Sequence, residues 1–418
     1  MSHRSRSLPA ALAATVVLLA TACFPSTGPD RPPAALTELP RSLSGSERTV
    51  LGAANEFTFT LFRQLSGAQR GANVFVSPLS ASMALGMTMN GAAGTTLEEM
   101  RAALAFGGAS QQEINAGYEG LIDLLRGLDR GVDFRIANSI WYEQSFPFHQ
   151  SFFDAVRGPF GAEVRGLDFK SAAAVPTINT WVNAQTNGKI PTILDEIPAD
   201  ARMYLINAIY FKGSWRHRFD PAKTESAQFT TASGATQPVS LMHSQHGMRY
   251  LETPELQAVD LAYGSDAFAM TVILPAPGTD IETVAASLSS ERWAGWIAQL
   301  REREVGLYLP KLKLEYERVL NDDLQALGVR RAFAAGGADF TRMSPRGEDL
   351  FVSVVKHKTY VDVHEEGTEA AAVTSVEIRV VSAPVVPTMR VDRPYLFAIR
   401  ERLSGTILFI GKIVEVQA

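Results

Sequence analysis

Apolar positions in the first half of the chain recur with the spacing of a helix. That spacing is seen at Leu51, Ala54, Leu61, Phe62 and Leu65. A serine followed directly by proline, Ser77 and Pro78, predicts an N-cap and the first turn of a helix over 79–89. Thr95 and Glu98 have the spacing of a capping box, which predicts a further helix. The first half of the chain is therefore predicted to be mainly helical.

Apolar runs in the second half are shorter and rich in β-branched and aromatic residues, as strands are. The predicted strands cover 203–211, 268–274, 305–314, 358–363 and 407–416. Helices followed by strands indicate an α+β fold with largely antiparallel sheets. We predict one domain over 50–418. Two unrelated domains are the alternative, because about 370 residues exceed the usual size of a single core.

Composition and charge exclude two classes of protein. Of the 418 residues 46% are hydrophobic and 20% are charged, which is ordinary for a globular chain and excludes disorder of the whole. Removing residues 1–22 takes away two of the 39 basic residues and no acidic one, so 37 basic residues remain against 44 acidic ones, a balance of −7. Nucleic acid is therefore not an expected partner, because phosphate binding needs a surplus of clustered Lys and Arg.

The N-terminus has the pattern of an export signal. Arg4 and Arg6 precede an apolar run of about 15 residues that ends in small residues before Cys23, the only cysteine. A membrane-spanning helix needs about 20 such residues, so we predict a signal peptide over 1–22 rather than an anchor. Cleavage after Ala22 would give a secreted protein. Lipoprotein processing, whose lipobox the sequence resembles, would leave Cys23 as a lipidated first residue. We favour lipidation, because a solitary cysteine at this point has no other evident use.

A linker is predicted to follow this signal. Five prolines, separated by Ser, Thr and Gly, lie within residues 24–47. Such a composition keeps a chain extended and unpacked, so 23–49 is predicted to be a tether. We expect a cell-envelope protein held at a membrane by its lipid, periplasmic or on the cell surface, with secretion into the medium as the alternative.

Motifs of common enzymes are missing from the sequence. No G-x-S-x-G string is present, which disfavours a hydrolase with a nucleophile elbow. His243 and His246 are two residues apart in a predicted loop, and His364 lacks the second histidine of H-E-x-x-H. Gly188 and Lys189 stand in a string without the first glycine and the hydroxyl of a phosphate-binding loop. We expect no enzyme activity, no metal and no cofactor.

Residues 365–381 form the most unusual segment of the chain. If residues 368–380 formed a strand, one face would be uncharged and the other would carry every charge. The uncharged face is Thr368, Ala370, Ala372, Thr374, Val376, Ile378 and Val380. Small residues at its start would let the strand slip between neighbours, Gly367 is a natural hinge, and Pro384 would end a central strand. Taken alone, the pattern equally fits an ordinary edge strand or an Ala-rich linker.

Several separated motifs resemble one family, the serpins. The string Glu365-Glu366-Gly367-Thr368-Glu369-Ala370-Ala371-Ala372 resembles the proximal hinge of inhibitory serpins. Further similarity lies at 73–80, 180–190, 207–215 and 392–411, in the family's order, and extends over nearly the whole chain after Val50. Two positions depart from the pattern: Tyr395, where phenylalanine is usual, and Val373, where a smaller residue is usual.

The resemblance implies a fold of three mostly antiparallel sheets with about nine helices and an exposed reactive loop over about 365–390. It also implies a monomeric suicide-substrate inhibitor that traps a serine protease as an acyl-enzyme by inserting its cleaved loop into the central sheet. Counting as the family does, with Glu365 seventeenth before the scissile bond, places cleavage between Val381 and Ser382. A small β-branched bait residue fits elastase-like or subtilisin-like proteases. Arg379 is the alternative bait and would indicate trypsin-like targets.

The resemblance assigns five further residues to the control of sheet opening. These are Ser77, Ser80, Asn207 and His357 in the shutter and Trp215 in the breach. Their expected role is control of stability rather than chemistry. Two other functions stay open at this point. One is a serpin fold that binds or chaperones without inhibiting, and the other is a structural surface lipoprotein whose loop is incidental.

Overall fold

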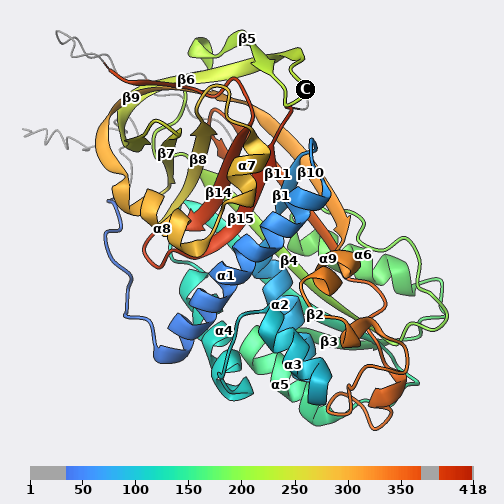
Figure 1. Ribbon diagram of the computed structural model, residues 1–418. Helices are drawn as coiled ribbons and strands as arrows, with labels where there is room; N and C mark the ends of the chain where they lie inside the picture. The colour runs from blue at the N-terminus through green and yellow to red at the C-terminus, as the bar shows by residue number, and fades with distance from the viewer. Residues whose placement is uncertain (1–33, 369–385, 417–418) are drawn as a thin grey trace, which may run out of the picture. The chain divides into compact units, whose positions relative to one another are not determined.

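The computed structural model describes residues 34–368 and 386–416, which belong to one compact unit. The described part has nine α-helices (Figure 1). They are α1 Gly45–Ala68, α2 Pro78–Met89, α3 Gly94–Ala103, α4 Gln111–Leu125, α5 Gln150–Phe160, α6 Ala174–Gln185, α7 Ile281–Ala286, α8 Ser290–Gln299 and α9 Asn321–Ala326. In the described residues no helix is both long and apolar enough to cross a bilayer.

Fifteen strands complete the described part. They are β1 Val74–Val76, β2 Val132–Glu143, β3 Glu163–Leu167, β4 Met203–Ser214, β5 Glu225–Thr230, β6 Thr236–Glu252, β7 Leu256–Tyr263, β8 Phe268–Pro275, β9 Arg301–Pro310, β10 Leu312–Val319, β11 Lys356–His364, β12 Gly367–Thr368, β13 Thr388–Arg390, β14 Tyr395–Glu401 and β15 Ile407–Ile413.

The strands form two hydrogen-bonded sheets. One has nine strands in the order β1-β15-β14-β8-β7-β6-β9-β13, with β5 paired to β6. The other has six, in the order β10-β11-β12-β4-β2-β3. Three sheets were predicted. In the structure two of them form the single nine-stranded sheet, because the long strand β6 pairs with β5 and β9 along one part and with β7 along another. The predicted α+β class is confirmed.

Helix α1 begins inside the segment predicted to be a linker. The Ser44 hydroxyl accepts a hydrogen bond from the Glu47 amide at 3.1 Å, and the Glu47 carboxylate accepts one from the Ser44 amide at 2.6 Å. This capping box starts the helix at Gly45, so the last five residues of the predicted linker 23–49 are helical. Glu47 also pairs with Arg41, which ties the chain before the helix to its first turn.

Other local predictions had mixed outcomes. Ser77 caps α2 with Pro78 in the first turn, as predicted. The capping box predicted at Thr95 and Glu98 is wrong, because α3 already begins at Gly94 and has no side-chain cap. The predicted strand 305–314 is two strands separated by Lys311, and His243 lies in strand β6 rather than in a loop.

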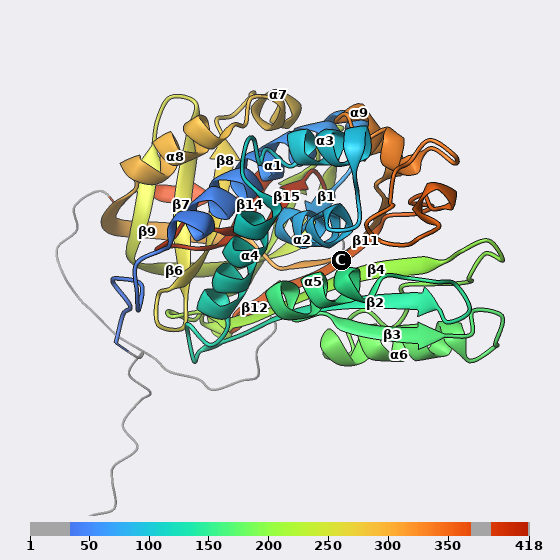
Figure 2. The same ribbon diagram turned by 90° about the horizontal axis from the view of Figure 1, so that it is seen from below.

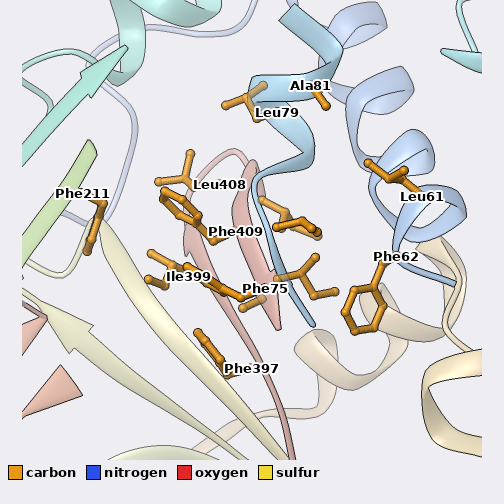
Figure 3. Packing of buried hydrophobic residues seen from close by; sticks show 14 of the residues in the cluster. Leu61, Phe62, Phe75, Leu79, Ala81, Phe211, Phe397, Ile399, Leu408 and Phe409 are labelled. Atoms are coloured by element: carbon orange, nitrogen blue, oxygen red, sulfur yellow. The ribbon is translucent and has the colours of Figure 1, made fainter. Parts of the chain in front are cut away.

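The main core lies where α1 and α2 meet the nine-stranded sheet. Phe75 of β1 stacks between Phe397 of β14 and Phe409 of β15, with both pairs of ring centroids 5.4 Å apart (Figure 3). A smaller core lies beneath α6, where Ile178 and Val182 pack with the strand residues Trp141 and Ile206. Figure 2 shows α6 on one side of β2, β3 and β4, with α2 and α5 on the other. The six-stranded sheet is therefore covered on both faces.

Candidate functional site between two strands of the six-stranded sheet

Strand β12 is a two-residue wedge between two long parallel strands. Thr368 is paired with Val363 of β11 on one side and with Gly213 of β4 on the other. Within the described chain, β11 and β4 are joined only through β12. The edges of β11 from Asp362 to Lys356 and of β4 from Lys212 to Met203 therefore face each other with no described strand between them. We call this space the gap.

The wedge is held by close packing at its tip. The Thr368 side chain is 3% exposed, and its hydroxyl lies 2.6 Å from that of Tyr263. Burial raises the pKa of Tyr263, so the phenol stays protonated. Gly367 approaches the β4 backbone so closely that a Cβ atom there would lie 2.1 Å from the Gly213 carbonyl oxygen. Only glycine fits at this position without moving β4.

The turn before the wedge is fixed by an ion pair and two backbone contacts. The Glu365 carboxylate accepts hydrogen bonds from Lys311 at 2.8 Å and from the Thr224 hydroxyl at 2.7 Å. Burial alone would raise the pKa of Glu365, but these two donors hold it below its ordinary value. Phe219 and Trp215 donate their amides to the carbonyl groups of Glu365 and Glu366, both at 2.9 Å.

Trp215 lies at the end of the gap next to the wedge. Its indole Nε1 donates to the His364 carbonyl at 2.8 Å, and its ring stacks on Tyr263 with centroids 4.4 Å apart. Trp215 is 3% exposed. The tryptophan therefore joins the end of β4 to the end of β11 beside the wedge. Its role in sheet opening stays a prediction.

A buried polar cluster lies further along the gap. The Ser77 amide donates to His357 Nε2 at 3.1 Å, and the Ser77 hydroxyl donates to the Leu408 carbonyl at 2.7 Å. The Ser80 hydroxyl reaches the Asn207 carbonyl at 3.5 Å. The structure thus brings Ser77, Ser80, Asn207 and His357 together from α2, β4 and β11.

His357 is neutral in this cluster. Its Nε2 accepts a hydrogen bond, so that nitrogen carries no proton. Burial lowers the pKa of His357 to about 4. Protonation would add a charge in a buried site and would remove the acceptor for the Ser77 amide.

Asn138 is a member of the cluster that the sequence analysis missed. It lies opposite Asn207 in the pairing of β2 with β4, and its Oδ1 accepts from Asn207 Nδ2 at 2.5 Å. Its own amide donates to the Phe160 carbonyl at 2.6 Å. The available signal was an asparagine in the middle of an apolar strand, where an unpaired polar side chain is costly.

A cavity of about 490 Å³ lies along the lower part of the gap. Ser80, Leu205, Asn207, His357 and Leu350 contribute to its lining. The Asn207 Oδ1 atom is buried without a hydrogen-bond partner. Leu205, Asn207 and Ile209 stay half-buried although they share the inward side of β4 with buried Phe211. An additional strand beside β4 would cover these side chains.

The connection from α6 to β4 crosses the gap on the other face of the sheet. Asn187 Nδ2 donates to the Tyr210 hydroxyl of β4 at 3.2 Å, whereas the Lys189 ammonium lies 4.9 Å from the centre of the Tyr360 ring of β11. Lys358 of β11 donates to the Thr192 carbonyl at 3.3 Å. We call residues 187–195 the strap, because they contact both strands that border the gap.

The remaining predicted site residues lie outside the described residues. These are Glu369, Ala370, Ala371 and Ala372 of the hinge, Arg379, Val381 and Ser382 of the bait region, and Cys23. The structure therefore places the base of the predicted loop and leaves its bait bond as a prediction.

Comparison with known proteins explains this arrangement. Residues 52–416 match the model of the family described as Serpin (serine protease inhibitor). The chain belongs to the serpin family. Serpins are generally protease inhibitors and not enzymes, and the gap beside β12 lies in the six-stranded sheet of this serpin.

Relatives of this serpin are found in distant organisms. An uncharacterized serpin-like protein of Thermococcus kodakarensis is 35% identical over 89% of this chain and 87% of its own length. Serpin B6 of Pongo abelii is 36% identical over 87% of this chain and 98% of its own length.

Two solved structures show the same fold. Native tengpin, a thermophilic serpin, has a TM-score of 0.81 at 30% identity, with 92% of this chain and 97% of tengpin covered. Human thyroxine-binding globulin, solved in complex with thyroxine, has a TM-score of 0.82 at 29% identity, with 90% of this chain and 100% of the globulin chain covered. A family of protease inhibitors and a thyroxine-binding globulin thus share this architecture, so the fold alone does not fix the function.

Proposed function

We propose that this serpin is an irreversible suicide-substrate inhibitor of serine proteases. The observation that supports it is the wedge at Gly367 and Thr368, which enters a gap that no other described strand occupies. A hinge that has already started to pair with both neighbours needs only a free end to continue. Cleavage of the loop would supply that end.

The chemistry begins as ordinary proteolysis. The protease serine attacks the carbonyl carbon of Val381, the bond to the Ser382 nitrogen breaks, and the leaving amine takes a proton from the protease's base. The new ester joins the protease to Val381. Insertion of the loop would then carry the protease away before water reaches this ester.

The register of the wedge sets how far the loop can insert. With Thr368 opposite Gly213, residues 369–378 would come opposite Lys212 to Met203 of β4. Ten residues at about 3.3 Å each extend about 33 Å. The uncharged face that begins at Thr368 would turn inward, and Thr374 would meet His357 and Asn207 beside the cavity.

The bait residue sets the class of protease. Val381 fits the small primary pocket of elastase-like or subtilisin-like enzymes, and Arg379 would instead favour a trypsin-like enzyme. Incubating the purified serpin with one protease of each class, followed by denaturing gels and mass spectrometry, tests the proposal. We expect a covalent band and a release of residues 382–418. The absence of a covalent band with all three proteases would overturn it.

Changing Thr368 separates inhibition from mere cleavage. Thr368→Arg would place a charge where the side chain is 3% exposed, so the loop should be cut without trapping the protease. Thr368→Ser keeps the hydroxyl next to Tyr263 and is expected to trap as the wild type does. Unchanged trapping by Thr368→Arg would contradict insertion at this wedge. A wild type that itself failed to trap any protease would instead favour the non-inhibitory alternative, a binding protein or chaperone.

The location is a second proposal, and it depends on Cys23. We propose that the mature chain is a monomer tethered to a cell-envelope membrane by lipid on Cys23, with residues 24–35 as the tether. In the native host, Cys23→Ser is expected to move the protein from the membrane fraction to the soluble fraction, with loss of the lipid mass on the N-terminal peptide. A wild-type chain that is soluble and unmodified would support plain secretion instead.

A further inference from the structure

The solvent face of the strands next to the loop carries a stacked row of side chains. His243 of β6 and Tyr308 of β9 are directly paired, and Arg390 of β13 is paired with Tyr308 on the other side. The His243 and Tyr308 rings are 4.3 Å apart and inclined by 14°, and the Arg390 guanidinium lies 4.8 Å from the centre of the Tyr308 ring. We call His243, Tyr308 and Arg390 the aromatic row.

The row is rigid although it is partly exposed. Arg390 reaches across it to Glu225 of β5, with Nη1 and Oε1 2.9 Å apart, and its Nε lies 3.6 Å from Asp392. The opposite face of the same strands is buried, with Met242, Leu307 and Met389 all at about 0% exposure. All three side chains are therefore pre-positioned, so a partner would lose little conformational entropy in ordering them.

The row lies directly under the end of the loop. The Gly306 amide donates to the Pro387 carbonyl at 3.0 Å, and the Val391 amide donates to the Tyr308 carbonyl at 2.9 Å. Thr388 is six positions after Ser382 in the sequence, a separation of about 20 Å at most. A protease domain of about 200 residues has a radius of roughly 21 Å. An enzyme that holds the bait bond would therefore overlie the row.

We propose that the aromatic row is an exosite, a second docking surface for the body of the protease that engages the bait bond. This inference rests on the proposed inhibitory function. Tyrosine and arginine are the residue types that most often dominate binding at protein interfaces. The row would add affinity to the encounter complex, and it would select among proteases whose active sites accept the same bait.

The charges of the row indicate the surface that it fits. Glu225 pairs with Arg390 at 2.9 Å and balances its charge, whereas Asp392 lies nearer to Arg393, at 3.2 Å, than to Arg390, at 3.6 Å. The row itself therefore has no net charge that would attract an acidic partner. Burial, together with nearby Lys223, lowers the pKa of His243, which keeps the imidazole neutral at pH 7. The fitting partner is an uncharged protease loop that presents apolar side chains and peptide carbonyl groups. Binding through the row should therefore change little with salt.

The test measures binding before any acylation occurs. The probe is an elastase-like protease whose nucleophilic serine is replaced by alanine, and the Kd of its complex with the full chain is measured by surface plasmon resonance. Tyr308→Ala is expected to weaken binding about tenfold, as loss of an interface tyrosine does. Tyr308→Phe keeps the ring and should stay within about twofold of wild type. Glu315→Ala, on exposed β10 of the other sheet, is the control for a distant change.

If the aromatic row only stabilised β13 and did not bind the protease, the variants would give a different set of Kd values and unfolding midpoints. His243→Ala removes the end of the row on β6, a strand that is not paired with β13, and is expected to weaken binding about threefold with an unchanged unfolding midpoint. Unchanged Kd values for both alanine variants would overturn the exosite. So would weaker binding by Tyr308→Ala alone with a lowered unfolding midpoint. The absence of any covalent complex between wild type and active proteases would instead refute the proposed function.

Discussion

The buried imidazole of His357 makes the stability of this serpin depend on pH. Its pKa is lowered to about 4 in the folded chain, against an ordinary value of 6.5. The unfolded chain therefore binds a proton first, so the stabilising contribution is complete above pH 6.5 and is lost as the pH falls toward 4. A difference of about 2.5 pKa units corresponds to about 3 kcal/mol of the free energy of unfolding.

Replacing His357 tests this contribution. In His357→Gln the amide oxygen can still accept from the Ser77 amide, but nothing there titrates between pH 4 and 6.5. We expect urea unfolding of wild type to lose about 3 kcal/mol more than His357→Gln between pH 7 and pH 4. His149→Gln serves as a control for the loss of a histidine outside the cluster. Equal pH dependence in wild type and His357→Gln would show that the imidazole is not buried as described.

At the scale of elements, the strap contacts both strands that border the gap, so we expect it to oppose their separation. The Lys356 ammonium of β11 lies 3.2 Å from Asp195 of the strap and 2.9 Å from Glu317 of β10. Of these two ion pairs, only the pair between Lys356 and Asp195 joins the strap to the sheet, because Glu317 and Lys356 both belong to the sheet. A strand entering between β4 and β11 has to displace the contacts that the strap makes with both strands.

Weakening the strap is expected to speed loop insertion. Asp195→Asn removes the ion pair to the strap, and since Asp195 is exposed the pair contributes only about 0.5 kcal/mol, or about twofold in rate. Glu317→Gln is the control within the sheet, because it removes ion pairs of Lys356 and Lys358 that do not involve the strap. Insertion is followed after cleavage by stopped-flow tryptophan fluorescence. Equal rates in the two variants would mean that the strap does not limit insertion.

Local signals made some elements predictable, and long-range contacts made others unpredictable. The N-cap at Ser77 and the strand over 358–363 follow from neighbouring residues alone. The break between β9 and β10 does not, because Lys311 is set by its bond to the distant Ser240 carbonyl and its ion pair with Glu365. The hinge and the shutter were predicted from family resemblance alone, and the contacts of their described residues became visible only with the register of β11 and β4. Asn138 is recognisable only once β2 is paired with β4.

At the scale of the whole molecule, the inhibitor proposal requires a folded chain that is not at its most stable arrangement. Described β4 has ten positions, and β11 seven, that face the gap beyond Thr368. A strand inserted there would add roughly ten backbone hydrogen bonds at about 1 kcal/mol each and would fill the cavity next to His357. This difference in free energy between the intact and the inserted form drives insertion only after the loop is cut.

Cleavage at the bait bond should therefore raise the unfolding temperature. A gain on the order of 10 kcal/mol, spread over about 370 residues with about 2.1 cal/mol/K each, corresponds to a rise of about 13 °C. Differential scanning calorimetry of intact and nicked serpin measures this directly, and Thr368→Arg nicked at the same bond is the control, because its hinge cannot enter the gap. A nicked wild type that unfolds at the temperature of the intact chain would refute insertion. A nicked Thr368→Arg that gains as much would place the new stability somewhere other than between β4 and β11.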